Sequence, residues 1–181
     1  MAPSAHRRTG QPLAELALEA RALSAAELAR DFGPAFLLRQ GGATHASGMV
    51  LQTMTAHSAG RTEAQAGRGL LDYRVYVVRR AGTTRFGGDY IGLGRADHND
   101  LVIEDPSVSK FHALIVQEGP SFSLSDAGSR NGTFINDQRA PNYREGRPAP
   151  LRDGDSVRLG DVRLTFMLSE GVWRLLQRAG T

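Results

Sequence analysis

The chain has 181 residues, which is enough for one domain with a substantial core or for one domain with an appendage. It contains no cysteine, so a disulfide framework, a thiol nucleophile and a cysteine-rich zinc site are excluded. The formal net charge of +3 is compatible with an anionic partner but too small to indicate nucleic acid, and no apolar run reaches the ~18 residues of a membrane-spanning helix. We therefore expect a cytoplasmic protein that binds neither nucleic acid nor membrane.

Residues 1–69 form a predicted N-terminal arm with a disordered start, short helices and candidate extra strands. After Pro12, apolar residues recur at helical spacing: Leu13, Leu16, Ala17, Ala20 and Leu23. Ser24 and Glu27 match a capping box, S-x-x-E, which predicts the start of a second short helix. The arm is a candidate docking element for a partner, but we favour an arm that packs on the main domain.

Further along the arm, residues 36–39 and 49–54 are apolar enough for strands, and residues 59–69 favour a loop. From residue 70 to residue 168 the pattern predicts one β domain. Strands are expected at residues 73–78, 90–93, 101–103, 113–116, 122–124, 133–135 and 162–166, with a polar loop at residues 141–150 and a hairpin between Gly82 and residues 87–88. No helix separates consecutive strands, which excludes βαβ units and favours an antiparallel sandwich or barrel.

The last segment, residues 169–181, predicts a short C-terminal helix that Ser169 could cap. Its apolar side carries Val172, Trp173, Leu175 and Leu176.

Three loop motifs between the predicted strands carry groups suited to binding a phosphorylated peptide. Arg95 can bind a phosphate with two parallel hydrogen bonds, Ser109 offers a hydroxyl donor and Lys110 offers a compact cation. Asn131 can both donate to and accept from a peptide backbone. With Gly132 it also forms a dipeptide typical of hairpin turns, so we expect it to form a turn as well as to bind.

These motifs resemble the signature of forkhead-associated (FHA) domains, as found in bacterial FHA-domain proteins. The resemblance rests on Gly94-Arg95, on S-x-x-H at residues 109–112 and on Asn131-Gly132, together with matching residues around them between residues 73 and 166. It implies an all-β fold, an antiparallel sandwich of the FHA/SMAD type with about eleven strands. It also implies a non-catalytic phosphothreonine reader that needs no cofactor and acts in signalling by Ser/Thr protein kinases.

The resemblance also implies roles for single residues. Arg95 and Ser109 would hold the phosphate, Lys110 would add a contact to it, and Asn131 would hold the peptide backbone. Gly94, His112 and Gly132 would support the site structurally. Arg130 departs from the smaller polar residue of many relatives, which leaves two roles open: a further phosphate contact or a preference for acidic flanking residues.

The partner implied is a Thr-phosphorylated protein or peptide, and with it a Ser/Thr protein kinase or its substrate. The alternative is a phosphate-independent interaction or assembly module, for example in a secretion or signalling complex. An enzyme is disfavoured because no nucleophile and base stand at a recognisable spacing. Metal binding is disfavoured as well, since the five histidines lack metal-ligand spacing.

Overall fold

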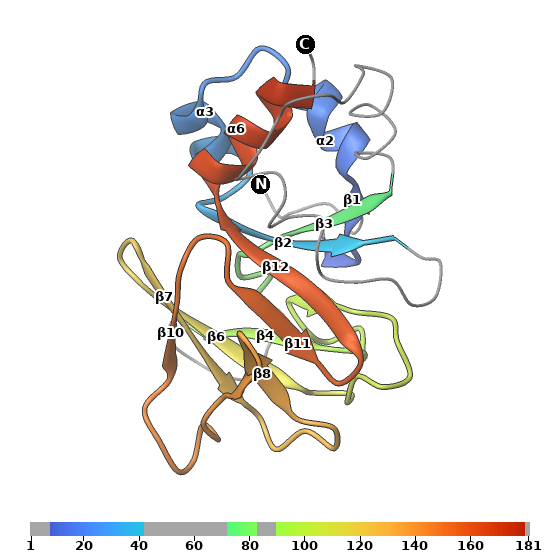
Figure 1. The fold of residues 1–181 in the computed structure, drawn as a ribbon, viewed down its shortest axis with the longest axis vertical. Helices are drawn as coiled ribbons and strands as arrows, with labels where there is room; N and C mark the ends of the chain where they lie inside the picture. The colour runs from blue at the N-terminus through green and yellow to red at the C-terminus, as the bar shows by residue number, and fades with distance from the viewer. Residues whose placement is uncertain (1–7, 42–71, 83–89, 180–181) are drawn as a thin grey trace.

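The computed structural model describes residues 8–41, 72–82 and 90–179, which form two packed sheets with a layer of helices above one of them (Figure 1). The expected strand at residues 49–54, the loop at residues 59–69 and the hairpin turn at residues 83–89 lie outside the described residues. Within the described part, the expected all-β sandwich with an N-terminal helical arm and a C-terminal helix is confirmed.

One sheet has seven strands and the other has five. The seven-stranded sheet runs in the order β1 (Gln11–Pro12), β3 (Tyr73–Val77), β2 (Ala35–Gln40), β12 (Val162–Leu168), β11 (Ser156–Leu159), β8 (Thr133–Ile135) and β9 (Gln138–Arg139). The five-stranded sheet runs in the order β10 (Ala149–Leu151), β7 (Ser121–Asp126), β6 (Ala113–Glu118), β4 (Tyr90–Gly94) and β5 (Leu101–Val102). Among these described strands, β4 and β5 pair in parallel and the other neighbours pair antiparallel.

The strand pattern in the sequence places the main core between the two sheets. Along β12, Val162, Leu164 and Phe166 are buried and face the five-stranded sheet, because alternate residues of a strand point to the same face. The Phe166 ring lies 5.4 Å from the ring of Phe122 on β7, measured between centroids. Apolar side chains of both sheets thus fix how the sheets stack, and with them the positions of the loops that join them.

A second core lies between the helices and the outer face of β2, β3 and β12. The helices are α2 (Leu13–Glu19), α3 (Ala25–Asp31) and α6 (Ser169–Ala179). On β2, Phe36 and Leu38 face this layer, whereas Ala35 and Leu37 face the main core. Both faces of β2 are therefore buried, which explains its continuous apolar run.

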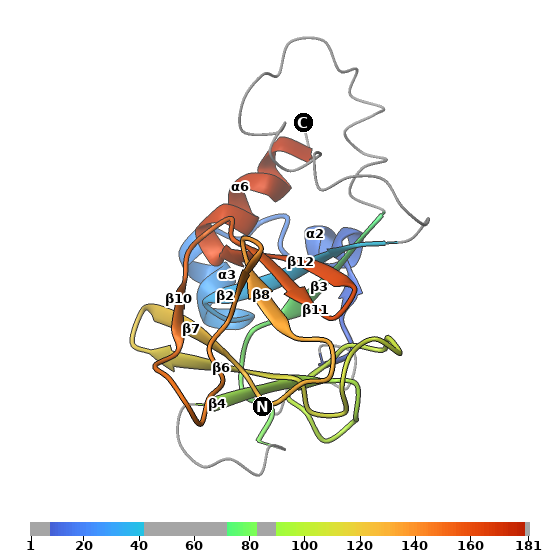
Figure 2. The same ribbon diagram turned by 60° about the horizontal axis from the view of Figure 1, so that its bottom comes forward.

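The local helix signals in the sequence agree with the structure. Ser24 caps α3: its hydroxyl accepts a hydrogen bond from the backbone N–H of Glu27, whose carboxylate accepts one from the N–H of Ser24 at 2.8 Å. Helix α6 follows β12 directly, as Figure 2 shows. Ser169, the expected cap of α6, donates its hydroxyl to the carbonyl oxygen of Gly33 at 2.8 Å, and Trp173 Nε1 donates to the carbonyl oxygen of Leu23. These two bonds join α6 to the N-terminal arm.

Two turn assignments from the sequence were wrong. Pro150 was expected in a loop but lies in β10, which is tolerated because β10 is an edge strand that lacks a neighbour on one side. Asn131-Gly132 was expected to form a hairpin turn, yet it connects β7 of one sheet to β8 of the other. The tight turn between β8 and β9 falls at Asn136 and Asp137, as this Asn-Asp pair in the sequence indicates, and both residues have a positive φ.

Candidate functional site

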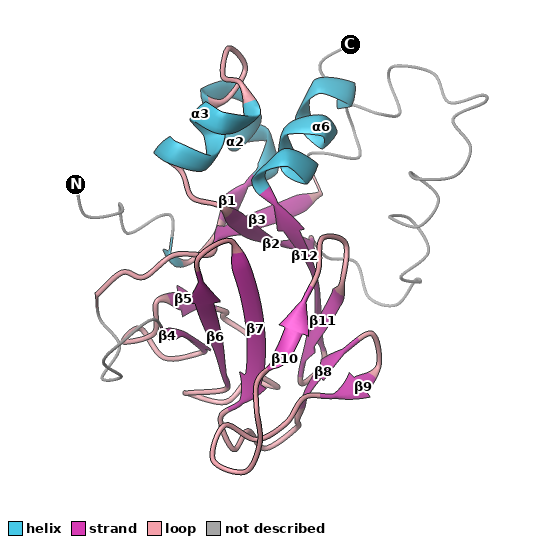
Figure 3. Cartoon of the chain, turned by 90° about the vertical axis from the view of Figure 1, so that its left-hand side faces the viewer, coloured by secondary structure: helices cyan, strands magenta, loops and turns pink. Residues whose placement is uncertain are grey.

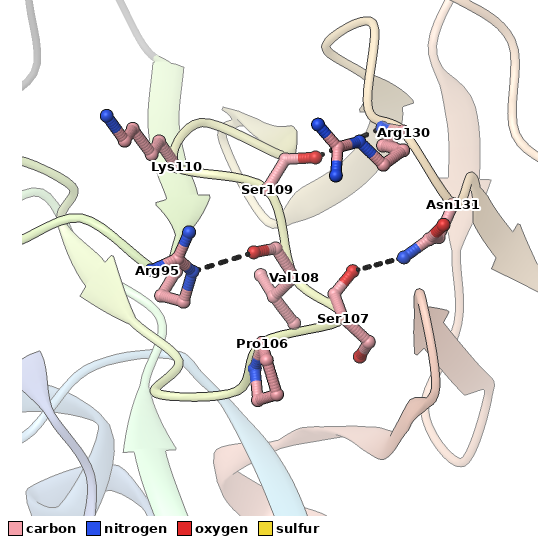
Figure 4. Close-up of a pocket in the computed structure, with 8 residues that line it drawn as sticks. All are labelled: Arg95, Pro106, Ser107, Val108, Ser109, Lys110, Arg130 and Asn131. Atoms are coloured by element: carbon pink, nitrogen blue, oxygen red, sulfur yellow. Dashed lines mark hydrogen bonds between the residues drawn. The ribbon is translucent and has the colours of Figure 1, made fainter.

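Three loops meet at one open hollow of about 250 Å³ (Figure 4). The first loop follows β4, the second joins β5 to β6, and the third joins β7 to β8. The hollow is lined by Arg95, Pro106, Ser107, Val108, Ser109, Lys110, Arg130 and Asn131. All five residues that the sequence assigned to phosphopeptide binding are therefore brought together.

Arg95 lies on the first loop and is exposed to solvent. Its backbone N–H donates to the carbonyl oxygen of Ser109 at 2.9 Å, and its Nε donates to the carbonyl oxygen of Val108 at 3.2 Å. Within the described residues, its two terminal nitrogens have no hydrogen-bond partner. One edge of the guanidinium is thus fixed by the second loop while the terminal N–H groups are free to bind an anion.

The first two loops approach each other closely at Gly94. A Cβ atom at this position would lie 2.4 Å from the carbonyl oxygen of Lys110, so only glycine fits without a backbone shift. The same carbonyl accepts a hydrogen bond from Nδ2 of the buried Asn99 at 2.7 Å. Gly94 and Asn99 together set the distance between the Arg95 backbone and the backbone at Ser109.

His112 is fully buried and links the second loop to the third. Its Nδ1 accepts from the backbone N–H of Ser109 at 2.9 Å, and its Nε2 lies 3.1 Å from the carbonyl oxygen of Gly132. Because Nδ1 accepts, the neutral ring carries its proton on Nε2 and donates to that carbonyl. Burial lowers the pKa of His112, which outweighs the opposing effects of the Gly132 hydrogen bond and the Asp126 charge. A neutral imidazole held at both nitrogens acts as a positioning group.

Ser109 and Asn131 face the hollow from two different loops. The Ser109 hydroxyl oxygen accepts from the backbone N–H of Arg130 at 3.0 Å, which leaves its own proton available to a ligand. Nδ2 of Asn131 donates to the carbonyl oxygen of Ser107 at 2.8 Å. No bond to the Asn131 carboxamide oxygen is found among the described residues. This carboxamide can therefore still accept one hydrogen bond and donate another.

The hollow is electropositive. Three of its lining residues are cations, namely Arg95, Lys110 and Arg130, and none of its described lining residues is acidic. In Figure 4 the Lys110 side chain extends away from Ser109 and Asn131, whereas Arg130 lies beside Ser109. Lys110 therefore contributes its charge to the rim without a direct contact to the other side chains.

Asp126 also supports the site, although it stands in none of the three loop motifs. Its carboxylate accepts from the backbone N–H groups of Gly128 and Ser129 and from the hydroxyls of Ser129 and Thr133, at 2.5–2.9 Å. Burial raises the pKa of Asp126, but these hydrogen bonds outweigh it and hold the pKa below the usual 3.8. Asp126 thus fixes the loop that carries Arg130 and Asn131. Its short spacing to Gly128 and Ser129 was the available sequence signal.

A second support comes from β2 and carried no local signal in the sequence. Arg39 forms a partly buried ion pair with Asp105, with a nitrogen–oxygen distance of 2.9 Å. The Asp105 carboxylate accepts from both the backbone N–H and the hydroxyl of Ser107, at 3.0 and 2.7 Å. Because the Ser107 carbonyl in turn holds Asn131, a strand of the N-terminal arm supports the wall of the hollow.

The sequence over the core of this fold has known relatives. The model of the FHA domain family matches residues 91–160, which include all three loops of the hollow. This part of the chain is an FHA domain. The matched residues begin at β4 and end at β11, so β2, β12 and the helices lie outside the match.

Curated relatives match part of the chain. The transcriptional regulatory protein EmbR of Mycobacterium tuberculosis is 34% identical over 79 residues, which cover 44% of this chain and 19% of EmbR. The glycogen accumulation regulator GarA of Mycolicibacterium smegmatis is 36% identical over 74 residues, covering 41% of this chain and 43% of GarA. The chain thus spans less than half the length of either relative. A solved structure of EmbR of M. tuberculosis in complex with a low-affinity phosphopeptide is 30% identical, with a TM-score of 0.39, and covers 46% of this chain and 21% of that chain.

Within the described residues, no helix has the length and apolar character that crossing a membrane requires. The same residues contain no cluster of three or more metal-ligating side chains.

Proposed function

We propose that the FHA domain of this chain binds a phosphothreonine-containing segment of a partner protein and acts as a non-catalytic adaptor in Ser/Thr kinase signalling. The partner would be a Thr-phosphorylated protein, either a kinase or a kinase substrate, in the cytoplasm. The observation that carries the proposal is the convergence of Arg95, Ser109 and Asn131, from three loops, on one open and electropositive hollow.

The chemistry of the hollow suits a phosphoryl group on a peptide. Such a group carries a charge of about −1.5 to −2 near neutral pH and three acceptor oxygens. The terminal nitrogens of Arg95 and the hydroxyl of Ser109 would donate to these oxygens, and each bond to the charged group contributes about 1.5–3 kcal/mol. After the cost of ordering the peptide, two or three such bonds correspond to dissociation constants on the order of micromolar.

The backbone of the peptide would be held by Asn131. Its side chain keeps a free oxygen and one free N–H, which match the N–H and C=O groups of an extended strand. The bond from Nδ2 to Ser107 fixes the plane of the carboxamide before the peptide arrives, so little side-chain entropy is lost on binding. Selectivity for threonine over serine is part of the proposal through the family resemblance alone.

The relatives support a regulatory adaptor. EmbR is named as a transcriptional regulator and GarA as a regulator of glycogen accumulation, and each is more than 30% identical to part of this chain. The family model that matches residues 91–160 is that of the FHA domain, which supports a binding role.

Replacement of Arg95 tests the proposal. Arg95→Ala is expected to weaken binding of a phosphothreonine peptide by about 30-fold to 1,000-fold, or about 2–4 kcal/mol, because the dianion loses its charged donors. Calorimetric titration of a phosphothreonine peptide library would measure the loss, with the matched phosphoserine and unphosphorylated peptides for comparison. The thermal midpoint should stay unchanged, since the exposed side chain makes one bond, to a loop carbonyl.

Arg30→Ala provides a matched control, because Arg30 is an exposed arginine of α3 in the helical layer. It should bind the peptide like the unmodified protein. Equal affinity of the Arg95→Ala variant would refute the assigned pocket. Equal affinity for the unphosphorylated peptide would instead favour the phosphate-independent interaction module.

A further inference from the structure

The outer face of the seven-stranded sheet is only half covered. The helices pack over β3, β2 and β12. Figure 3 places β11, β8 and β9 away from the helices, and Figure 1 shows the same for β11 and β8. No described segment of the chain packs on this uncovered half with an apolar cluster of its own. Among the described residues, this half of the sheet is therefore open to a partner.

A row of side chains crosses this uncovered half. Phe134 on β8 is directly opposite Arg139 on β9 and Arg158 on β11, so all three side chains share one face of the sheet. Thr133 and Ile135 are buried on the other face, which directs Phe134 outward. The guanidinium carbon of Arg158 lies 3.7 Å from the centroid of the Phe134 ring, a stacking distance. We call this set the Arg139–Phe134–Arg158 row.

One end of the row adjoins the phosphopeptide hollow at Gly132. A Cβ atom on Gly132 would lie 2.9 Å from the Phe134 ring and 3.9 Å from the guanidinium carbon of Arg139. Since Gly132 follows Asn131, the Arg139 guanidinium lies next to the residue proposed to hold the peptide backbone. The row is thus continuous with the rim that carries Arg130 and Asn131.

A second connection runs through Gly160. Arg158 Nη1 donates to the carbonyl oxygen of Gly160 at 2.9 Å, and the Gly160 N–H donates to the carbonyl oxygen of Gly132. Gly160 also packs against Ser107, a lining residue of the hollow, because a Cβ there would lie 2.5 Å from the Ser107 carbonyl oxygen. The backbone beneath the row and the backbone of the hollow are therefore one connected structure.

The charge of the row is not neutralised within the described residues. Neither Arg139 nor Arg158 forms an ion pair there, whereas the next arginine along the same line, Arg163 on β12, pairs with Asp137 at 3.4 Å. Asp161, on the turn between β11 and β12, forms no ion pair within the described residues. Two guanidinium groups without an ion pair among the described residues thus flank the Phe134 ring, and that of Arg158 lies over it.

We infer that the Arg139–Phe134–Arg158 row binds acidic side chains in the segment that flanks the phosphothreonine. The inference rests on the proposed function of the hollow and names the class of peptide that it takes. Guanidinium groups match carboxylates in planar, two-bond geometry. The row has two cations, of which Arg139 is exposed and Arg158 is half-buried, and this is too little charge for a nucleic-acid backbone. An extended peptide anchored at Asn131 advances about 3.3 Å per residue and so reaches the row within a few residues of the phosphate.

The test compares phosphothreonine peptides that differ only in the flanks. Two glutamates or two glutamines are placed two to four residues from the phosphothreonine, on the N-terminal side in one pair and on the C-terminal side in another. On one of the two sides, the glutamate peptide should bind about 3- to 10-fold tighter than the glutamine peptide at low salt, and the difference should shrink at high salt.

Arg139→Gln should reduce that difference and leave the affinity for the glutamine peptide unchanged. Arg139 is exposed and makes no described hydrogen bond, so this variant should fold. Arg139→Glu should reverse the preference. Arg163→Gln is the matched control, since its charge is already paired with Asp137, and it should keep the preference.

Equal affinity for glutamate and glutamine peptides on both sides would overturn the assignment of the row. So would a glutamate preference that persists in Arg139→Gln and Arg139→Glu. Neither result would contradict phosphate binding in the hollow. If phosphorylated and unphosphorylated peptides bind with equal affinity, both the proposed function and the assignment of the row are wrong.

Discussion

The carboxylate of Asp126 organises the loop that presents Arg130 and Asn131. Four donors point at its two oxygens, two of them backbone N–H groups that would be left without a partner in its absence. Asp126→Asn keeps the shape of the side chain but removes its charge. We expect a loss of about 1–3 kcal/mol in the free energy of unfolding near neutral pH, because charge-assisted bonds become neutral ones.

The pH dependence of this loss identifies its cause. The pKa of Asp126 is lowered in the folded protein, because its hydrogen bonds outweigh the effect of burial. Its contribution to the free energy of unfolding is therefore complete above the ordinary pKa of 3.8. The contribution disappears as the pH falls below 3.8 through the lowered pKa. Denaturant unfolding of both proteins from pH 7 to pH 2 should therefore show a difference that shrinks in acid. A constant difference down to pH 2 would assign the loss to packing.

At the scale of single elements, the N-terminal arm contributes to the fold through α2. Leu16 of α2 is fully buried in the core between the helices and the sheet. Leu18, two residues away on the same helix, is 75% exposed. Leu16→Ala should lower the free energy of unfolding by about 2–5 kcal/mol, from lost burial and the cavity left behind. Leu18→Ala should change it by less than about 0.5 kcal/mol. Similar values for the two variants in denaturant unfolding would show that α2 does not pack on the sheet in solution.

Individual strands and helices differ in how well the sequence predicts them. Residues that alternate between the two faces of a strand identified β3 and β12. The pair Ser24 and Glu27 identified the start of α3. Both signals depend only on residues close together in the chain. The edge strand β10 was missed, since Pro150 suits a loop and an unpaired strand edge equally well.

The candidate site was foreseen only in part, for the same reason. Arg95, Ser109 and Asn131 stand in short loop motifs and were named from them. The support that Arg39 gives to Asp105 joins residues 66 positions apart and depends on β2 lying in the sheet, which no local pattern specifies. The row across β9, β8 and β11 depends likewise on strand register.

At the scale of the whole molecule, the two cores share strands. Strand β2 has Leu37 in the core between the sheets and Phe36 in the core beneath the helices, so loss of either core removes the burial of the same strand. The hollow is joined to this strand through Arg39 and Asp105. The division of the chain at residues 69 and 168, expected from the sequence, remains a prediction; the shared strand favours one cooperative unit over separate parts.

Ligand binding should therefore stabilise the described fold as a unit. A phosphothreonine peptide present at about 100 times its dissociation constant adds about 2.7 kcal/mol to the free energy of unfolding. For a protein of this size, that corresponds to an increase of about 5–10 °C in the thermal midpoint. Calorimetry should show a single transition that moves as a whole.

The controls separate binding from cooperativity. The unphosphorylated peptide should leave the midpoint unchanged, because it has no dianion. The phosphorylated peptide should raise the midpoint of the Arg95→Ala protein by no more than about 3 °C, because the dianion loses its charged donors. Two transitions, of which only one responds to the peptide, would contradict the single unit and would place the helical layer outside it. A single transition whose midpoint rises equally with both peptides would instead show that binding does not depend on the phosphate.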